Sequence, residues 1–260
     1  MTARRRRAIE TFLEVLVPVL ILLAWGVWSA GADSFYFPPL TDILTSFRET
    51  WLFDRFGSDV VPSLIRLAAG YFIAVALGVA IGVPLGLSAI ARRSASPLVE
   101  FLRAIPPPAL LPFAILVFGV GVGMKIFIIA FVCIWPVMLN TIDGIRGIDL
   151  TLRDTAYSYR ITGWERLRRV VLPAASPQIF AGMRTSLALA LILMVVSEMV
   201  ASTNGIGFFV LQAQRSFSIP EMWSGILLLG LLGYALNAVF VFFERRSLSW
   251  YHGAKQSEGN

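Results

Sequence analysis

The chain has 260 residues, of which 57% are hydrophobic and only 15% are charged, and its mean hydropathy is +0.75. A soluble domain carries about a quarter of its residues as Asp, Glu, Lys and Arg, so this composition excludes an ordinary soluble domain. The net charge of +6 comes from short basic runs between apolar segments. That distribution argues against a nucleic-acid-binding stripe and favours the loops of a membrane protein in a lipid bilayer.

Two residue types that carry much of protein chemistry are nearly absent. Cys133 is the only cysteine and lies in an apolar run, and His252 is the only histidine and lies in the polar tail. An intrachain disulfide, a cysteine or histidine metal site and a histidine-based catalytic triad are therefore excluded. We expect no catalytic residue, no metal and no cofactor.

Apolar segments long enough to cross about 30 Å of hydrocarbon follow one another along the chain. The first, at 12–31, follows Arg4–Arg7 and has the outline of a signal peptide, but its length and the later spans favour a retained membrane helix. A shorter segment at 109–121 follows Pro106–Pro108, so we expect it to be broken or tilted. The other four segments lie at 62–90, 125–144, 178–202 and 222–243.

The sequence therefore predicts an all-α polytopic membrane protein with about six transmembrane helices. We expect a cytoplasmic N-terminal segment at 1–11, a transmembrane domain at 12–244 and a cytoplasmic tail at 245–260. Residues 32–61 carry acidic and aromatic side chains, among them Trp51. They predict an external loop with a short interfacial helix and aromatic rings at headgroup depth.

The positions of Lys and Arg predict the orientation, because cytoplasmic loops carry the excess of basic residues. With the N-terminus inside, sixteen of the 22 basic residues fall on the cytoplasmic side, Arg103 among them, and four fall outside, Lys125 among them. Arg66 and Arg184 lie within spans, near enough to the ends to snorkel. Both termini are expected in the cytoplasm.

The longest polar interruption, at about 145–177, carries the signals of two short helices. Thr151 stands three residues before Asp154, which is a weak form of the capping box and predicts a first helix. Thr162 stands three residues before Glu165, which is a full capping box and predicts a second.

The second helix is expected to begin at Gly163 and to end before Pro173. The two helices, at about 149–172, then form a compact knob on the cytoplasmic side. A basic loop that only satisfies the orientation rule is the alternative interpretation. Exposed aromatic side chains among arginines favour a docking surface instead; they are Tyr157, Tyr159 and Trp164.

This segment resembles the cytoplasmic loop of binding-protein-dependent ABC importer permeases, whose pattern is E-A-A, three residues, glycine and a downstream I-x-L-P. Asp154–Ala156 stands at the start of the pattern, and Val170–Pro173 matches its end. Aspartate in place of glutamate preserves the charge. Arg160 stands where the family has a glycine that turns the chain, and Gly163 is a second candidate for that turn.

Three further groups of residues resemble the nitrate, sulfonate, taurine and bicarbonate subgroup of this family, and the likeness covers about residues 40–245. The resemblance implies a type I ABC importer-like permease for a small organic or inorganic anion, with a sulfonate-like anion ranked first, in the plasma (inner) membrane of a prokaryote. The groups are Ser63–Arg66 with Gly70 and Tyr71, Leu102–Pro106 with Ala109 and Pro112, and Glu198 with Gly205–Gly207.

The resemblance also implies partners: a second permease copy in a homodimer, two cytoplasmic ATPase subunits and an extracytoplasmic solute-binding protein. The chain itself is expected to be non-catalytic, because it contains no G-x-x-x-x-G-K-[ST] phosphate loop. The residues implied to couple to the ATPase are Asp154, Thr155, Ala156, Tyr157, Arg160, Gly163, Leu172 and Pro173.

The translocation pathway is expected beside polar or interrupted parts of the spans. Glu198 is the one carboxylate clearly within a span, so it is either a pathway or gate residue or a member of a structural ion pair. A secondary active transporter is the alternative function, although such proteins usually place several ionisable groups at this depth. A membrane enzyme lacks support, since H-E-x-x-H is absent. The expected pathway residues are Trp135, Pro136, Asn140, Ser197 and Glu198.

Overall fold

The computed structural model describes residues 34–249 and, before them, residues 12, 16–17, 19–21, 23–29 and 31. Every regular element from residue 34 to residue 249 is helical. The predicted all-α fold is therefore confirmed for this part of the chain. The predicted cytoplasmic segment at 1–11, residues 13–15, 18, 22 and 30 of the first span at 12–31, and residues 250–260 of the tail lie outside the described residues.

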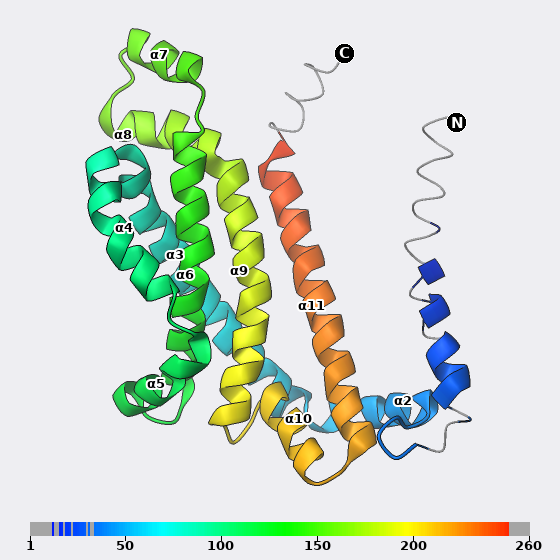
Figure 1. Cartoon of the computed structure of the whole chain (residues 1–260). Coiled ribbons are helices and arrows are strands. Elements are labelled where there is room, and N and C mark those ends of the chain that lie inside the picture. Colours follow the sequence, from blue (N-terminus) through cyan, green and yellow to red (C-terminus); the bar gives the residue numbers. More distant parts are fainter. Residues whose placement is uncertain are drawn as a thin grey trace.

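Four helices of the described part are long and apolar enough to cross a membrane (Figure 1). Each coincides with one of the predicted spans. Two of them join several elements without a break, because a π-helical turn continues directly into an α-helix. The four are Phe56–Leu87, which contains α3 (Val61–Leu87); α6 (Val122–Arg146); Gly163–Val200, which contains α8 (Gly163–Arg166), a π-helical turn (Leu167–Val171) and α9 (Leu172–Val200); and α11 (Ile219–Ser247).

A fifth span is broken in the middle, as the prolines predict. α4 (Ala89–Arg103) and the helical segment Pro107–Phe118, which ends in α5 (Leu111–Phe118), meet at 86°. Pro106 adopts an extended backbone at the break, because a run of prolines removes the N–H groups that would continue the helix. The described residues thus hold four or five of the roughly six predicted spans, depending on whether this bent pair counts as one.

α6 is the central helix of the bundle and packs most extensively against α3 on one side and α9 on the other. The contact with α3 is close, because α3 turns small residues toward α6 at intervals of four. A Cβ atom added to Gly78 would lie 2.8 Å from Val137, and one added to Gly82 would lie 2.7 Å from Thr141. Small residues let two backbones approach in this way, which replaces the hydrophobic drive that lipid does not supply.

One end of the bundle carries α2 (Leu40–Glu49) and α10 (Ile206–Arg215) (Figure 1). The short helix expected in residues 32–61 is therefore present as α2. Trp51, one of the aromatic residues expected at headgroup depth, does not face the surroundings of the protein: it is only 1% exposed, and its indole donates a hydrogen bond of 3.1 Å to Ser224. Its ring also packs edge-on against Phe209. Local composition indicated an interface, whereas α11 and α10 enclose this ring.

The opposite end carries the knob, defined as residues 149–172, which contains α7 (Leu150–Ser158) and α8 (Figure 1). The second knob helix begins at Gly163 as expected, but the expectation that it ends before Pro173 is wrong. The helix runs on to Val200. Pro173 follows the π-helical turn Leu167–Val171, where longer-range backbone bonds widen the helix and accommodate a residue without an N–H.

Candidate functional site

The first knob helix is capped by a residue that the sequence pattern did not indicate. The N-cap is Asp149, whose carboxylate accepts a 2.6 Å hydrogen bond from the backbone N–H of Thr151. The hydrogen bonds from Thr151 lower the pKa of Asp149 from its ordinary value. Thr162 occupies the N-cap position of α8 as predicted, but its side chain makes no capping hydrogen bond.

The turn after α7 contains both residues that were considered for the position of the glycine in the loop pattern. Arg160 has a φ of 55° and Gly163 a φ of 56°, so both adopt the left-handed conformation. The N–H of Arg160 donates to the carbonyl of Tyr157 and the N–H of Ile161 to that of Ala156, both at 2.9 Å. This pair of bonds is the Schellman motif. Arg160 therefore makes the glycine turn itself, at a cost of about 1–2 kcal/mol in backbone strain.

The surface of the knob combines a small buried residue with large exposed rings. Ala156 is only 3% exposed, and the side chains of Tyr157, Tyr159 and Trp164 are 72–82% exposed. Asp154, the acidic member of the weak capping box, makes no capping hydrogen bond. Its carboxylate is exposed and has no hydrogen bond or ion pair within residues 34–249, so it is available to a partner. Thr155 bonds back to the carbonyl of Thr151.

The knob is fastened to the membrane helices on two sides. Arg153 donates hydrogen bonds of 2.7 and 3.3 Å to the carbonyls of Ile145 and Arg146, the last turn of α6. Such bonds satisfy carbonyls that a helix end leaves free. Val171 packs with Ala175 and with Ile145 in a small apolar cluster, against which Leu172 also packs. Leu172 and Pro173 thus lie inside a continuous, partly buried helix.

A second candidate site is a groove of about 490 Å³ beside the middle of α6, called the Trp135 groove below. Trp135 and Pro136 stand at least about 15 Å from either end of α6, given a rise of 1.5 Å per residue. Arg103 at the end of α4 lies in this groove, beside the middle of a span, and not in a cytoplasmic loop as the charge count assumed. The groove is lined by Glu100, Arg103, Ala104, Val132, Trp135, Pro136, Leu139 and Leu189.

Glu100 and Arg103 form an ion pair inside this groove. The Nε and Nη2 atoms of Arg103 lie 2.8 and 2.6 Å from the same oxygen, Oε2 of Glu100. The two side chains remain 45% and 57% exposed, respectively for arginine and glutamate. A signal for this face was present in the sequence, because Arg93, Ser96, Glu100 and Arg103 recur at intervals of three and four, as one polar face of a helix requires.

The five residues expected near the pathway occupy three different places. Trp135 and Pro136 line the groove. Asn140 bridges two helices: its side chain donates to the carbonyl of Pro136 at 2.8 Å and accepts from Gln178 of α9 at 2.9 Å. Ser197 is fully buried and donates to a backbone carbonyl within α9. The structure does not bring Ser197 or Glu198 to the groove.

Glu198 lies at the other end of α9 in a buried ion pair. It is 0% exposed, and its carboxylate accepts a 2.8 Å bond from Nη1 of Arg66, bonds of 2.7 and 2.9 Å from the Ser63 hydroxyl, and one of 3.1 Å from the N–H of Gly207. Arg66 is 5% exposed and does not snorkel. The ion pair that was one of the two expected roles of Glu198 is therefore present, and its partner is Arg66.

The loop between α9 and α10 completes this arrangement, called the Glu198 cluster below. Nη2 of Arg66 donates to Asn204 at 2.6 Å, and the N–H of Gly205 donates to buried Asp59 at 2.6 Å. Gly205 has a φ of 120°, and a Cβ atom there would overlap the Glu198 carboxylate. The cluster consists of Asp59, Ser63, Arg66, Glu198, Asn204 and Gly205–Gly207.

Lys125, counted as an external loop residue, belongs to the same neighbourhood. It is part of α6, is 3% exposed and donates a 2.8 Å hydrogen bond to Ser202. Arg184 is exposed, and its Nε atom donates to Asn237 of α11 at 3.2 Å. Both residues bind polar partners on other helices or loops, which a count along the sequence does not reveal.

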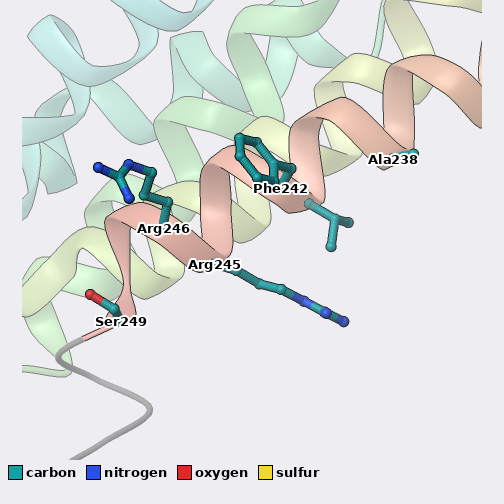
Figure 2. Close-up of a pocket in the computed structure, with 6 residues that line it drawn as sticks. Ala238, Phe242, Arg245, Arg246 and Ser249 are labelled. Carbon is teal, nitrogen blue, oxygen red and sulfur yellow. The ribbon is translucent and has the colours of Figure 1, made fainter.

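A third hollow, also of about 490 Å³, lies at the end of α11 and is lined by α11 residues and Ser249 alone. Figure 2 shows Arg245 and Arg246 pointing to different sides of the helix. Arginines at the end of a span are typical of anchors at the membrane surface. We do not consider this hollow a candidate site, because a single helix forms it.

Comparisons with known proteins agree on one family. The family described as "binding-protein-dependent transport system inner membrane component" matches residues 74–247. The putative aliphatic sulfonates transport permease protein of Bacillus subtilis is 31% identical, over 91% of this chain and 86% of the relative. The nitrate import permease protein of Leptolyngbya laminosa is 30% identical over 93% and 88%. The bicarbonate transport system permease protein of Synechococcus elongatus is 30% identical over 92% and 91%.

Solved structures resemble the chain in fold. The inward-facing MetNI methionine ABC transporter matches with a TM-score of 0.61 and 19% identity, over 72% of this chain and 95% of that one. An amino acid ABC transporter with histidines matches with a TM-score of 0.55 and 20% identity, over 78% and 98%. These structures share the helical arrangement.

Proposed function

Since the chain belongs to the binding-protein-dependent transport system inner membrane components, and within them to the nitrate, sulfonate and bicarbonate subgroup of ABC importer permeases, we propose that it is the membrane subunit of an ATP-driven importer of a small anion. Two copies form the pathway in this proposal. Two cytoplasmic ATPase subunits bind the two knobs, and an extracytoplasmic solute-binding protein delivers the anion.

The geometry of the knob is the observation that carries the proposal. A ligand shifts an equilibrium only when it contacts two states differently, so ATP binding in a partner needs a surface that moves with the membrane helices. The knob offers exposed aromatic side chains for docking. Its second half belongs to the helix Gly163–Val200, which is about 57 Å long at 1.5 Å per residue. Displacement of the knob is therefore transmitted directly into a span.

Substitutions on the knob test whether it binds the ATPase. Tyr157→Ala removes an exposed ring without disturbing packing, and we expect at least about a tenfold loss of ATPase co-purification, since exposed aromatic anchors dominate interfaces. Tyr234→Ala is the matched control, because Tyr234 is 76% exposed on α11, away from the knob. Ala156→Arg, which forces a charge into a buried position, is expected to have the larger effect. Normal association and transport in Tyr157→Ala and Asp154→Lys would exclude the knob as the coupling element.

Cysteine labelling tests the proposed orientation, in which the knob and both chain ends are cytoplasmic. The native Cys133 is 0% exposed and should not react with the reagent. The labelling signal therefore comes from the single added cysteine. Ser58 lies at the α10 end and Ser158 in the knob, and both are exposed. Ser58→Cys should react with an impermeant maleimide in intact cells, and Ser158→Cys should react only after permeabilisation. The reverse result would invert the proposed topology.

Reconstitution tests the energy source. The full chain, purified with its co-purifying ATPase, is placed in liposomes with the solute-binding protein, and uptake of labelled nitrate, bicarbonate or methanesulfonate is measured. We expect uptake only with ATP. Uptake driven by an ion gradient without ATP would instead support a secondary active transporter.

A further inference from the structure

The ion pair in the Trp135 groove lies at a depth where charges are expensive. The groove is formed by the middle of α6 together with Leu189 of α9, and both helices are long and apolar enough to span a membrane. Ionisable side chains at mid-span depth face protein or a water-filled cavity, because lipid does not solvate them. Arg103 and Glu100 are about half exposed. Water or a second protein surface must therefore cover them.

The exposure of α4 along its whole length indicates that its polar face contacts water. None of its residues is buried, and its polar face carries charges along its length. An apolar partner surface would leave these charges unpaired, which is costly. In the proposed dimer, a water-filled pathway between the two copies supplies the solvent that this face requires.

Hydrogen-bond donors in the groove remain unused. Arg103 directs Nε and Nη2 to one carboxylate oxygen, so its Nη1 atom has no partner within residues 34–249. The indole N–H of Trp135 also has none there; its ring packs against that of Phe131 in a T-shaped arrangement, with the ring centroids 5.4 Å apart. Arg103 thus keeps part of its planar fork free, and this fork matches the geometry of small oxyanions such as carboxylates and phosphates.

We propose that the Trp135 groove is an anion-binding station on the translocation pathway, where Arg103 binds a small oxyanion and Glu100 competes with it for the same guanidinium. This inference rests on the proposed function and specifies how the importer binds and releases its anion. An arriving anion takes over hydrogen bonds from Glu100, and Glu100 reclaims them when the anion leaves.

The competing carboxylate gives the site a property that transport needs. A pathway site must bind strongly enough for the ion to enter and weakly enough for it to leave. An unopposed arginine would retain an anion, because charge-assisted hydrogen bonds to an oxyanion are strong. Glu100 weakens this binding because the anion must displace it. The pair is therefore a positioning and release device, and its two members should have opposite effects on affinity.

Quenching of tryptophan fluorescence measures this binding directly. The full chain, with any co-purified ATPase retained, is placed in lipid nanodiscs, and iodide is used as a collisional quencher at constant ionic strength balanced with chloride, which is not an oxyanion. The difference between the native chain and Trp135→Phe isolates the signal of Trp135. Methanesulfonate, which does not quench, is then titrated as the oxyanion probe, and the concentration for half-maximal protection of Trp135 is recorded.

We expect saturable protection in the native chain. Arg103→Gln should raise the half-maximal concentration at least about tenfold, since charge-assisted bonds are lost. Glu100→Gln should lower it severalfold, because the competitor is neutralised. Arg93→Gln is the matched control; it lies on the same helix and outside the groove lining, and should leave the value unchanged.

The proposal would be overturned by no saturable protection in the native chain, by the native value in Arg103→Gln, or by weaker binding in Glu100→Gln. The last would mean that the pair is only structural. An equal change in Arg93→Gln would reduce the effect to general surface charge and would also overturn it. These outcomes are independent of ATP-driven uptake, so failure of the groove and failure of the proposed function are distinguishable.

Discussion

The chain contains two arginine–glutamate pairs with the same chemistry and opposite surroundings. Arg66 and Glu198 are buried at one end of the bundle, and the carboxylate accepts bonds from Arg66 and from two other groups, the Ser63 hydroxyl and the Gly207 N–H. Arg103 and Glu100 lie half exposed in a groove and bond only to each other among the described residues. The first pair joins α3 to α9, whereas the members of the second lie one turn apart on the same helix, α4.

This difference indicates different tasks. A buried pair held by several hydrogen bonds fixes one geometry, because any rearrangement leaves a charge without a partner. In Arg66 only the Nε atom lacks a partner among the described residues. An exposed pair with free donors exchanges partners at little cost. We therefore assign Arg66–Glu198 to holding the helices together and Glu100–Arg103 to contact with the anion on the translocation pathway. The predictions below are ordered from the largest expected effect to the smallest.

Removal of one member of the buried pair should have the largest effect. Arg66→Met or Glu198→Gln leaves a buried group unpaired, which costs about 3–5 kcal/mol. The free energy of unfolding in detergent, followed by circular dichroism, measures this loss. The double variant Arg66→Met/Glu198→Leu should lose less than either single variant. A double variant that loses the sum of both would show that the pair is not coupled.

The loop of the Glu198 cluster should be nearly as sensitive. Gly205→Ala places a Cβ atom on the Glu198 carboxylate at a φ of 120°, so we expect a loss of about 1–3 kcal/mol from backbone strain alone. Gly230→Ala is the control, since Gly230 is in α11 with open space around it. A helix-interior glycine gains up to about 1 kcal/mol on change to alanine. Equal stabilities of the two variants would contradict the packing described for Gly205.

A turn outside both pairs should change stability in the opposite direction. Arg160→Gly removes left-handed strain, and we expect α7 to gain about 1 kcal/mol. Hydrogen exchange of the α7 amides measures this local gain as slower opening. Faster exchange would mean that the Arg160 side chain contributes more to the knob than its backbone conformation costs.

The groove pair should have the smallest effect on stability. Glu100→Gln and Arg103→Gln should each change the free energy of unfolding by about 0–1 kcal/mol, as exposed pairs do. The same unfolding assay as for Glu198 measures it, so the two pairs are compared on one scale. A loss in Arg103→Gln as large as that in Arg66→Met would remove the distinction between them.

The spans and the break in the third span were predictable, because both depend on local properties. Apolar segments of about 20 residues indicate membrane helices, and the prolines before Ala109 prevent a continuous helix. The start of the second knob helix at Gly163 was also indicated locally. The continuation through Pro173 was not, because a π-helical turn accommodates the proline and no sequence pattern announces such a turn.

The candidate sites were less predictable, because they depend on residues far apart in the chain. Arg66 and Glu198 were both noted, but the contact between them across 132 positions arises only when α3 and α9 pack. The family-like groups that contain Ser63 and Gly205 are one site in space. Arg103 was assigned to a loop because a count of positive charges treats every polar stretch between spans as a loop, and α4 is a polar helix that turns back along the bundle.

The unbroken helix from Gly163 to Val200 also restricts how the chain can change in length. Each added residue rotates the two ends of a helix by about 100° relative to each other, since one turn takes 3.6 residues. One insertion between Ala175 and Met194 would turn the knob to a different azimuth relative to the Glu198 cluster. Insertions or deletions of seven residues, about two turns, would nearly restore the phase. Changes of one or two residues should therefore be far less tolerated in this helix than substitutions on its lipid-facing surface.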